Sequence, residues 1–496
     1  MSEPAPYLVD DADAPALREA VSAIGRAGYN EAAVLNRLGL FDLADLDWRL
    51  LHSYREERLA ERDTLSLAID LFLLQGCLVK DELDRLFEAS SREALLRTGI
   101  LDIDETGCAR ARASLFPVGG RRIFSDHNWP ELPHPGYTSV PYNQVMAIGN
   151  DSRHLAHVTI RRPIGSALDL CTGSGIQALM ATSHARRVCA VDVNPRAVRC
   201  TRFNAQALGI ANLEAVEGDL FEPVRGERFD LITANPPFVP SPVNTVRFRD
   251  GGPSGEDIQK RIVGGLPHHL APGGVAHLVT ELGEREGEPI AERLREWLAG
   301  ARMDICVLRV ATLSAGRYAI GHAKGSDFGS YLDAAGAWAR NLRAQGYARV
   351  VSVLVSFQWS LPGSEPWERV DESRPPQRAA GAEIEAAFLA ERLARDLDLR
   401  RRLEGSWLRR GDPIACFDAS VLRGGRIPTR AKAARLGQAL AIEYQLDSLE
   451  CQILARLDGR TAATELMRCC GEFDVLEASL LEAIRSLLRK RLVSME

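Results

Sequence analysis

Residues Ser166 to Gly175 read S-A-L-D-L-C-T-G-S-G, and this stretch decides the fold. The apolar run Ala167 to Cys171 predicts a short strand, the next four residues are a glycine turn, and helical spacing follows from Ile176 to Ser183. Glycines let a backbone approach a ligand closely, and a helix start offers unpaired N–H groups, so the pattern predicts a nucleotide-type cradle. The turn matches neither G-x-G-x-x-G nor the phosphate-loop pattern, which disfavours a dinucleotide or a triphosphate.

Two acidic residues follow the next two predicted strands. Arg187 to Asp192 is an apolar strand that ends in an acid about twenty residues after the glycines, where a carboxylate can accept hydrogen bonds from two ribose hydroxyls. Leu213 to Glu217 leads into Gly218-Asp219-Leu220-Phe221. There Asp219 could contact an adenine amino group, with the two apolar side chains beside the ring.

A fourth strand, Phe229 to Ala234, leads into Asn235-Pro236-Pro237-Phe238. The two prolines remove backbone donors and fix φ, so this loop is stiff. The carbonyl groups of Asn235 and Pro236 can then accept both hydrogens of a planar NH2 group, and the ring of Phe238 can stack on that plane. The stretch predicts a clip for an amide or an exocyclic amine, although a proline-rich turn that only ends a strand has the same composition.

The order of these four pieces resembles that of class I S-adenosylmethionine-dependent methyltransferases of the N-P-P-[YF] group, over about Gly149 to Trp359. Asp250 to Asp257, D-G-G-P-S-G-E-D, is similar to the glycine stretch of release-factor glutamine methyltransferases; a helix-capping loop would read the same. The chain departs from the family at Cys171, where glycine is frequent, and at Phe238, where tyrosine is usual. The resemblance implies catalytic roles for Asn235, Pro236, Pro237 and Phe238. It implies S-adenosylmethionine contacts at Gly149, Asp151, Asp169, Cys171, Thr172, Gly173, Gly175, Asp192, Val193, Asn194, Asp219, Leu220, Phe221 and Asn235.

The expected reaction is methyl transfer to a planar nitrogen of a protein, a peptide or an RNA. Two alternatives stay open: a tailoring methyltransferase for N, O or C on a small molecule or peptide natural product, and a non-catalytic regulator that binds S-adenosylmethionine. The intact clip disfavours the regulator, because a pure sensor needs no acceptor site. Glu281, at the end of a predicted fifth strand, is a candidate proton acceptor, and a helix-cap or salt-bridge role is the alternative.

Composition places the chain among ordinary globular proteins: 496 residues, 46% hydrophobic, 26% charged, net charge −6. The acidic balance offers no support for nucleic-acid binding, which usually relies on Lys and Arg. Ten cysteines show no metal-ligand spacing, so we expect no metal site and reduced thiols in a cytoplasmic protein. No signal peptide is visible and no apolar run is long enough to span a membrane.

The predicted fold class is α/β: a doubly wound, seven-stranded Rossmann-like methyltransferase sheet between two mainly helical modules. Residues 1–128 read as helices followed by a hairpin, typical of a winged-helix-like or substrate-binding module, and residues 129–136 as a proline-rich linker. Residues 137–360 form the predicted methyltransferase domain. After a linker over Leu361 to Pro376, residues 376–496 read as a helical, winged-helix-like module. The end modules could bind a substrate or a nucleic acid, or join two copies in a homodimer.

Overall fold

The computed structural model describes residues 7–8, 10–127, 142–396, 398–404, 406–410, 414–416, 430–435, 439–457, 460–468 and 476–495. The predicted linker at 129–136 lies outside these residues. The chain divides into two compact units, Met1–Ala156 with Arg162–Met303 and Thr312–Leu361, and His157–Arg161 with Asp304–Ala311 and Pro362–Glu496. No helix among the described residues is both long and apolar enough to cross a membrane.

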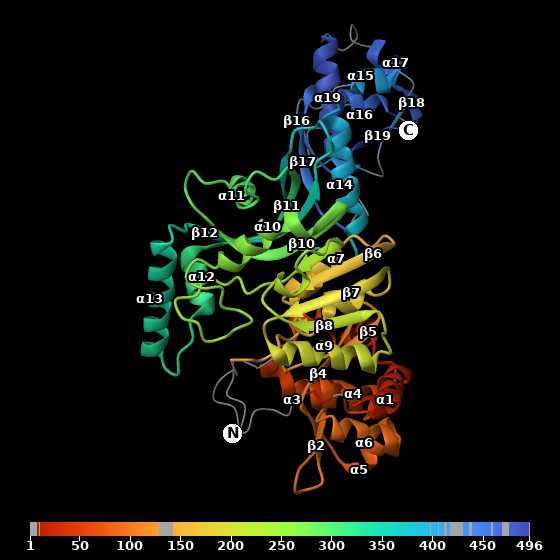
Figure 1. Ribbon diagram of the computed structural model, residues 1–496, viewed down its shortest axis with the longest axis vertical. Helices are drawn as coiled ribbons and strands as arrows, with labels where there is room; N and C mark the ends of the chain where they lie inside the picture. Colours follow the sequence, from red (N-terminus) through yellow and green to blue (C-terminus); the bar gives the residue numbers. More distant parts are fainter. Residues whose placement is uncertain are drawn as a thin grey trace. The chain divides into compact units, whose positions relative to one another are not determined.

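The first unit is built on a sheet in which six strands follow the order β12-β10-β9-β6-β7-β8 (Figure 1). Their bounds are β6 Ile164–Leu170, β7 Ala185–Asp192, β8 Leu213–Glu217, β9 Phe229–Ala234, β10 Leu270–Glu284 and β12 Arg349–Trp359. The five strands β6 to β10 are parallel to one another, and β12 is antiparallel to β10. The strand order reverses between β6 and β9, and ligands of open α/β sheets bind beyond the carboxyl ends of strands at such a point. The predicted alternation of strand and helix is confirmed here, and the count of seven strands stays a prediction.

Helices connect these strands. They are α7 Asn150–Val158, α8 Ile176–Ala181, α9 Pro195–Ala207, α10 Asp257–His269, α11 Ile290–Trp297, α12 Ala315–His322 and α13 Phe328–Ala344. The helical hairpin of α12 and α13 lies between β11 (Met303–Ser314) and β12 in the chain. Tyr318 and Ala319 of α12 pack with Trp338 of α13 and Val239 of the loop after β9, so the hairpin covers the loop that contains the N-P-P-F stretch.

The N-terminal residues of the first unit form helices and short strands, as predicted. They are α1 Ala14–Arg26, α2 Glu31–Leu38, α3 Leu51–Ser53, α4 Thr64–Phe72, α5 Lys80–Leu86, α6 Ala89–Arg97, β1 Cys77–Leu78, β2 Leu101–Ile103, β3 Ala109–Ala111, β4 Ser114–Val118 and β5 Arg121–Ser125. A separate module over 1–128 was expected. Instead Phe72 and Phe124 contact each other edge to face, and Phe124 also contacts Phe203 of α9, so these helices share one core with the sheet domain.

One predicted N-terminal helix is broken. The apolar residues from Leu46 to Leu59 have helical spacing, which predicts a continuous helix, but Trp48–Leu50 is a 3-10 turn and Tyr54–Arg58 is a π-helical turn on either side of α3. The carboxylate of Asp47 accepts a hydrogen bond from the backbone N–H of Arg49 at 2.9 Å. Such local side-chain bonds compete with regular helix, which explains why apolar spacing alone misled the prediction.

A buried ion pair joins the end of β5 to the start of α9. Arg196 donates to both carboxylate oxygens of Asp126, at 2.6 and 2.8 Å, and the hydroxyl of Tyr7 donates to the same carboxylate at 2.7 Å. Both charged side chains are more than nine-tenths buried. The N-terminal residues are therefore tied to the helix that follows the ribose-type acid of β7.

Asp126→Ala should lower the free energy of unfolding by about 3–5 kcal/mol, because it leaves the Arg196 guanidinium buried without its partner. Chemical denaturation of the full chain measures this. Glu227→Ala is the matched control: its pair with Arg187 is largely exposed, and such pairs contribute about 0–1 kcal/mol. Equal losses in the two variants would contradict the assignment.

The second unit contains α14 Gly381–Ala394, α15 Leu399–Leu403, α16 Ser448–Arg456, α17 Ala463–Arg468 and α19 Glu477–Arg489, with β13 Glu368–Glu372, β14 Trp407–Arg410, β15 Ile414–Cys416, β16 Arg430–Arg435, β17 Glu443–Asp447, β18 Arg460–Ala462 and β19 Val493–Met495. Helices were expected in this segment, whereas the small sheets β18-β14-β19 and β15-β16-β17 were not predicted. The expected linker over Leu361 to Pro376 contains a strand, because β13 pairs in parallel with residues 305–309 of β11. Pairing with a distant strand leaves no local signal in such a charged segment.

The expectation that all cysteines are reduced is wrong for one pair. Cys77 and Cys108 form a disulfide with their Cα atoms 5.8 Å apart, between β1 and the residues just before β3. Among the other described cysteines, Cys171, Cys189, Cys200, Cys306 and Cys451 are outside any disulfide. Antiparallel pairing of β1 with β3 brings the first two thiols together, and their separation of 31 residues gave no hint of it.

Candidate active site

The glycine turn joins β6 to α8 at the reversal point of the sheet. Asp169, near the end of β6, accepts hydrogen bonds from the hydroxyls of Thr172 at 2.6 Å and Thr233 at 2.8 Å. Burial raises the pKa of Asp169 to about 7, while these hydrogen bonds act in the opposite direction. Its carboxyl group therefore ties the turn to strand β9.

The backbone of this turn is left-handed at several residues. Cys171 has a φ of 54°, a conformation that costs an L-residue about 1–2 kcal/mol and that glycine adopts freely. This explains why related turns have glycine there. Burial also raises the pKa of the Cys171 thiol well above its usual value, so this side chain is a neutral thiol and no nucleophile.

Gly175 is required on two grounds. Its φ is 85°, and a Cβ atom added there would lie 2.8 Å from Cγ2 of Thr201 on α9. Thr201 is fixed in turn, because its hydroxyl donates to the carbonyl of Gly173 at 3.2 Å. The close packing of turn and helix thus depends on a missing side chain.

We expect Gly175→Ala to destabilise the protein by about 2–4 kcal/mol, the sum of a left-handed alanine and an overpacked contact. Gly226→Ala separates the two terms, since Gly226 has a φ of 84° and no atom within 4 Å of an added Cβ. That control should lose only about 1–2 kcal/mol in thermal or urea unfolding. Equal losses would mean that contact with Thr201 has no energetic weight.

Asp192 ends β7 and faces the glycine turn. Its carboxylate accepts hydrogen bonds from the backbone N–H groups of Gly173 and Asn194, both at 2.9 Å. Burial raises the pKa of Asp192, whereas these hydrogen bonds and the charge of Arg247 lower it. A Cβ atom on Gly173 would meet nothing within 4 Å, so the turn leaves open space beside the carboxylate. A ribose with two adjacent hydroxyls fits this arrangement.

The turn after β8 supplies one wall. Asp219 forms an ion pair with Arg261 of α10 at 2.7 Å, and Leu220 is buried. The ring of Phe221 stacks on His269 with 4.4 Å between ring centroids, so it packs against α10. The structure therefore places Asp219 and Leu220 on the cavity and uses Phe221 to hold the helix.

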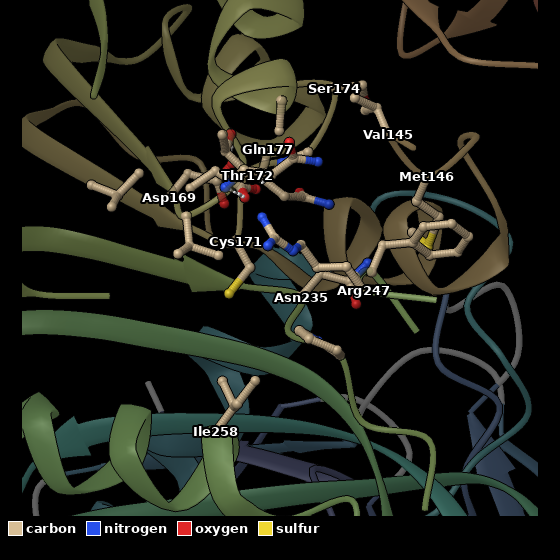
Figure 2. Close-up of a pocket in the computed structure, with 18 of the residues that line it drawn as sticks. Val145, Met146, Asp169, Cys171, Thr172, Ser174, Gln177, Asn235, Arg247 and Ile258 are labelled. Atoms are coloured by element: carbon tan, nitrogen blue, oxygen red, sulfur yellow. Dashed lines mark hydrogen bonds between the residues drawn. The ribbon is translucent and has the colours of Figure 1, made fainter. Parts of the chain in front are cut away.

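Asn235 lies at the carboxyl end of β9, next to the reversal point. Its amide Nδ2 donates to the hydroxyl of Ser152 on α7 at 3.2 Å, which leaves Oδ1 for another donor. The backbone carbonyl of Ser152 accepts a hydrogen bond from Gln177 of α8 at 2.6 Å. Two helices thus set the orientation of one side-chain amide. In Figure 2, Cys171, Thr172 and Asn235 surround one space, and Ile258 of α10 faces it from the opposite side.

The loop that follows Phe238 folds back against the clip. The N–H of Val239 donates to the carbonyl of Arg249 at 3.0 Å, and the N–H of Gly251 donates to the carbonyl of Val239 at 2.9 Å. Added Cβ atoms at Gly251 and Gly255 would meet the carbonyl oxygens of Pro237 and Phe238 at 2.9 and 2.4 Å. The D-G-G-P-S-G-E-D stretch is therefore glycine-rich because it packs on the backbone of N-P-P-F.

A single cavity brings together most of the predicted residues. Its lining includes Asp169, Cys171, Thr172, Gly173, Asp192, Val193, Asn194, Asp219, Leu220, Asn235 and Pro237. The predicted residues outside this lining are Gly149, Asp151, Gly175, Phe221, Pro236 and Phe238. Sequence reasoning missed Gln144, Val145, Met146, Ser152, Ser174, Ile176, Gln177, Val191, Ala197, Gly218, Arg247, Phe248, Ile258 and Arg261. Spacing from the glycine turn could have indicated Ser174 and Gln177, whereas Arg247 and Arg261 come from segments with no local signal.

Comparison with known proteins finds a family match in one region of the chain. Residues 148–297 match the family model of the methyltransferase small domain. The chain is 34% identical over 140 residues to the release factor glutamine methyltransferase of Moorella thermoacetica, covering 26% of this chain and 49% of that protein. It is 33% identical over 167 residues to the same enzyme of Clostridium acetobutylicum, covering 29% and 58%. It is 36% identical over 129 residues to the ribosomal protein uL3 glutamine methyltransferase of Bradyrhizobium diazoefficiens, covering 23% and 40%.

The chain spans about half the length of these relatives, and the matched segment holds the glycine turn, Asp192, Asp219 and the clip. That segment also coincides with strands β6 to β10 and the cavity at their carboxyl ends. Residues 148–297 are thus similar to a class I S-adenosylmethionine-dependent methyltransferase domain of the small-domain type.

Proposed function

We propose that this protein transfers a methyl group from S-adenosylmethionine to the side-chain amide nitrogen of a glutamine in a protein. The orientation of Asn235 is the observation that carries the proposal. Because Nδ2 donates to Ser152, Oδ1 is the atom that can accept a hydrogen from an incoming NH2 group. The relatives named above methylate glutamine according to their names.

The residues at the cavity suit the cofactor. Asp192 would accept the two ribose hydroxyls, Gly173 would let the backbone approach, and Asp219 with Leu220 would contact the adenine. When bound, the sulfonium supplies an already activated methyl group. The protein's task is therefore to hold donor and acceptor in line and to exclude water, which can lower a barrier by several kcal/mol.

The clip would act mainly in the transition state. As the N–C bond forms, positive charge develops on the acceptor nitrogen, and its hydrogens become stronger donors. The Oδ1 atom of Asn235 and the carbonyl of Pro236 would then bind them more tightly than in the ground state. The ring of Phe238 would stack on the amide plane. This assigns the four N-P-P-F residues to positioning and to charge stabilisation.

The test is a set of parallel labelling reactions with tritiated S-adenosylmethionine. The acceptors are a purified bacterial release factor, purified ribosomal protein uL3, a mixed RNA preparation and free glutamine. We expect label in a protein fraction, with one methyl group on a glutamine by tandem mass spectrometry, and none with Asn235→Ala. Label confined to RNA or to small molecules would contradict the proposal and favour the other acceptors.

The N-terminal helices are placed to influence the clip, and we assign them a role in acceptor docking. Arg153, the neighbour of Ser152 on α7, forms ion pairs with Asp42 and with Glu31 of α2. An acceptor docked on these helices could therefore shift Ser152. Homodimer formation through the end modules is a further proposal, and sedimentation velocity of the full chain tests it: a single species at monomer mass would contradict it.

A further inference from the structure

Glu281 is a carboxyl group on β10, the strand that pairs with β9, and the mechanism above gives it no role. It lies near the end of β10. This strand pairs in parallel with β9, and there Leu278 of β10 stands opposite Ala234, the residue before Asn235. On its other side Glu281 stands opposite Ser352 of β12. The hydroxyl of Tyr318 on α12 donates to its carboxylate at 2.5 Å, and that of Ser352 donates at 3.1 Å.

The charge of a second carboxyl group acts on Glu281. Asp151 lies on α7, directly before the residue that holds the amide of Asn235, and its charge acts on Glu281. Asp151 is therefore next in the chain to Ser152, the residue that binds the amide of Asn235. Glu281 lies on β10, which pairs with β9, the strand that ends just before Asn235.

The aromatic side of the clip belongs to the same arrangement. Phe238 packs against the cluster that includes Tyr318, Trp338 and Val239. Tyr318 in turn stacks on His322 with 4.1 Å between ring centroids, and the charge of Arg249 acts on it. The proposed stacking ring and the hydroxyl bound to Glu281 are therefore parts of one packed wall on the acceptor side.

We propose that Glu281 is the proton acceptor for the nitrogen that is methylated, with Tyr318 and Ser352 as its positioning residues. This rests on the proposed function. In the step, the S–CH3 bond breaks and its electron pair stays on sulfur, while the lone pair of the amide nitrogen forms the N–CH3 bond. As this bond forms, an N–H bond breaks, its electron pair stays on nitrogen and the proton forms an O–H bond with Glu281. The carboxylic acid afterwards releases the proton to solvent.

The surroundings of Glu281 suit that task. Burial raises the pKa of Glu281 to about 7, and the charge of Asp151 acts in the same direction, whereas the hydrogen bonds from Tyr318 and Ser352 lower it. Arg249 and His322 face Tyr318 from the neighbouring loop and from α12. A general base is most effective when its pKa is near the working pH. Because the carboxylate is the active form, turnover should rise with pH through this pKa and then level off.

The experiment is a set of pH profiles of kcat at saturating S-adenosylmethionine, with the protein acceptor labelled by the wild-type chain. Glu281→Gln should lower the plateau by about 10²-fold and abolish the acidic limb. Tyr318→Phe removes a hydrogen bond to the carboxylate, so the limb should move to higher pH. Asp151→Asn removes a like charge, so the limb should move to lower pH. A purely structural Glu281 would not produce two shifts of opposite sign.

Glu288→Gln is the matched control, because Glu288 is an exposed residue beyond β10 that pairs with Arg285. Its profile should match that of the wild type. Identical limbs in all variants would overturn the assignment, while absence of any labelled protein in the wild type would overturn the proposed function instead.

Discussion

Asn235→Ala is expected to lower kcat by about 10²–10³-fold, the loss typical of removing one group that binds developing charge. The variant loses the Oδ1 acceptor and also the bond to Ser152, so only the Pro236 carbonyl and the Phe238 ring remain to hold the acceptor amide in line with the donor. The affinity for S-adenosylhomocysteine should change far less, because Asp192 and the glycine turn remain. Single-turnover rates and calorimetry of the same preparation separate the two effects.

Asn212→Ala is the control for this variant. The amide of Asn212 donates to the carbonyls of Thr182 and Ala185, at 3.1 and 2.9 Å, and it is not part of the cavity lining. This variant should keep kcat and lose only some stability. Normal turnover in Asn235→Ala would defeat the role of the clip.

Asp192→Asn is expected to weaken binding of S-adenosylhomocysteine by about 10–100-fold, or ~1.4–2.7 kcal/mol. An amide can accept at only one of its two positions. Its NH2 group would face either the N–H of Gly173 or that of Asn194, and one ribose hydroxyl would lose its acceptor. The loss should therefore combine a weaker ligand contact with a looser glycine turn.

The pH dependence of S-adenosylhomocysteine binding is a second test of the role of Asp192. Burial raises the pKa of Asp192, so its anionic form is lost at a higher pH than for an exposed aspartate. Affinity should be full above this pKa and should fall as the pH drops through it. Asp192→Asn should remove that dependence. Glu217→Gln, an exposed residue at the end of β8, should leave both affinity and pH dependence unchanged, and an equal loss there would contradict the assignment.

The sequence predicted the sheet domain well because its signals are local. Strands β8 and β9 have the predicted bounds, and β6 and β7 differ by a few residues. Each is a short apolar run next to a turn, and parallel strands buried on both faces read as such runs. The C-terminal strands and β13 were missed because their pairing depends on distant partners.

The residues of the candidate site also fall into two groups, those that the order of motifs located and those whose position depends on packing. Asp192, Asp219 and Asn235 follow strands at fixed spacing, so the order of motifs alone placed them at one edge of the sheet. Ser152 and Arg247 could not be found from spacing, because each comes from a segment whose approach to the cavity depends on packing. Glu281 was weighed as a proton acceptor, but its partner Tyr318 belongs to a helix that was not predicted.

The amino-acid sequence by itself determined the parallel sheet, the glycine turn and the rigid clip, since these depend on backbone chemistry within a few residues. Only the tertiary structure decided that the N-terminal helices share a core with the sheet, which way the amide of Asn235 is turned, and which hydroxyl group binds Glu281. The physical reason is that hydrogen-bond direction and burial depend on side chains that are far apart in the chain. The spacing of residues along the sequence therefore does not predict them.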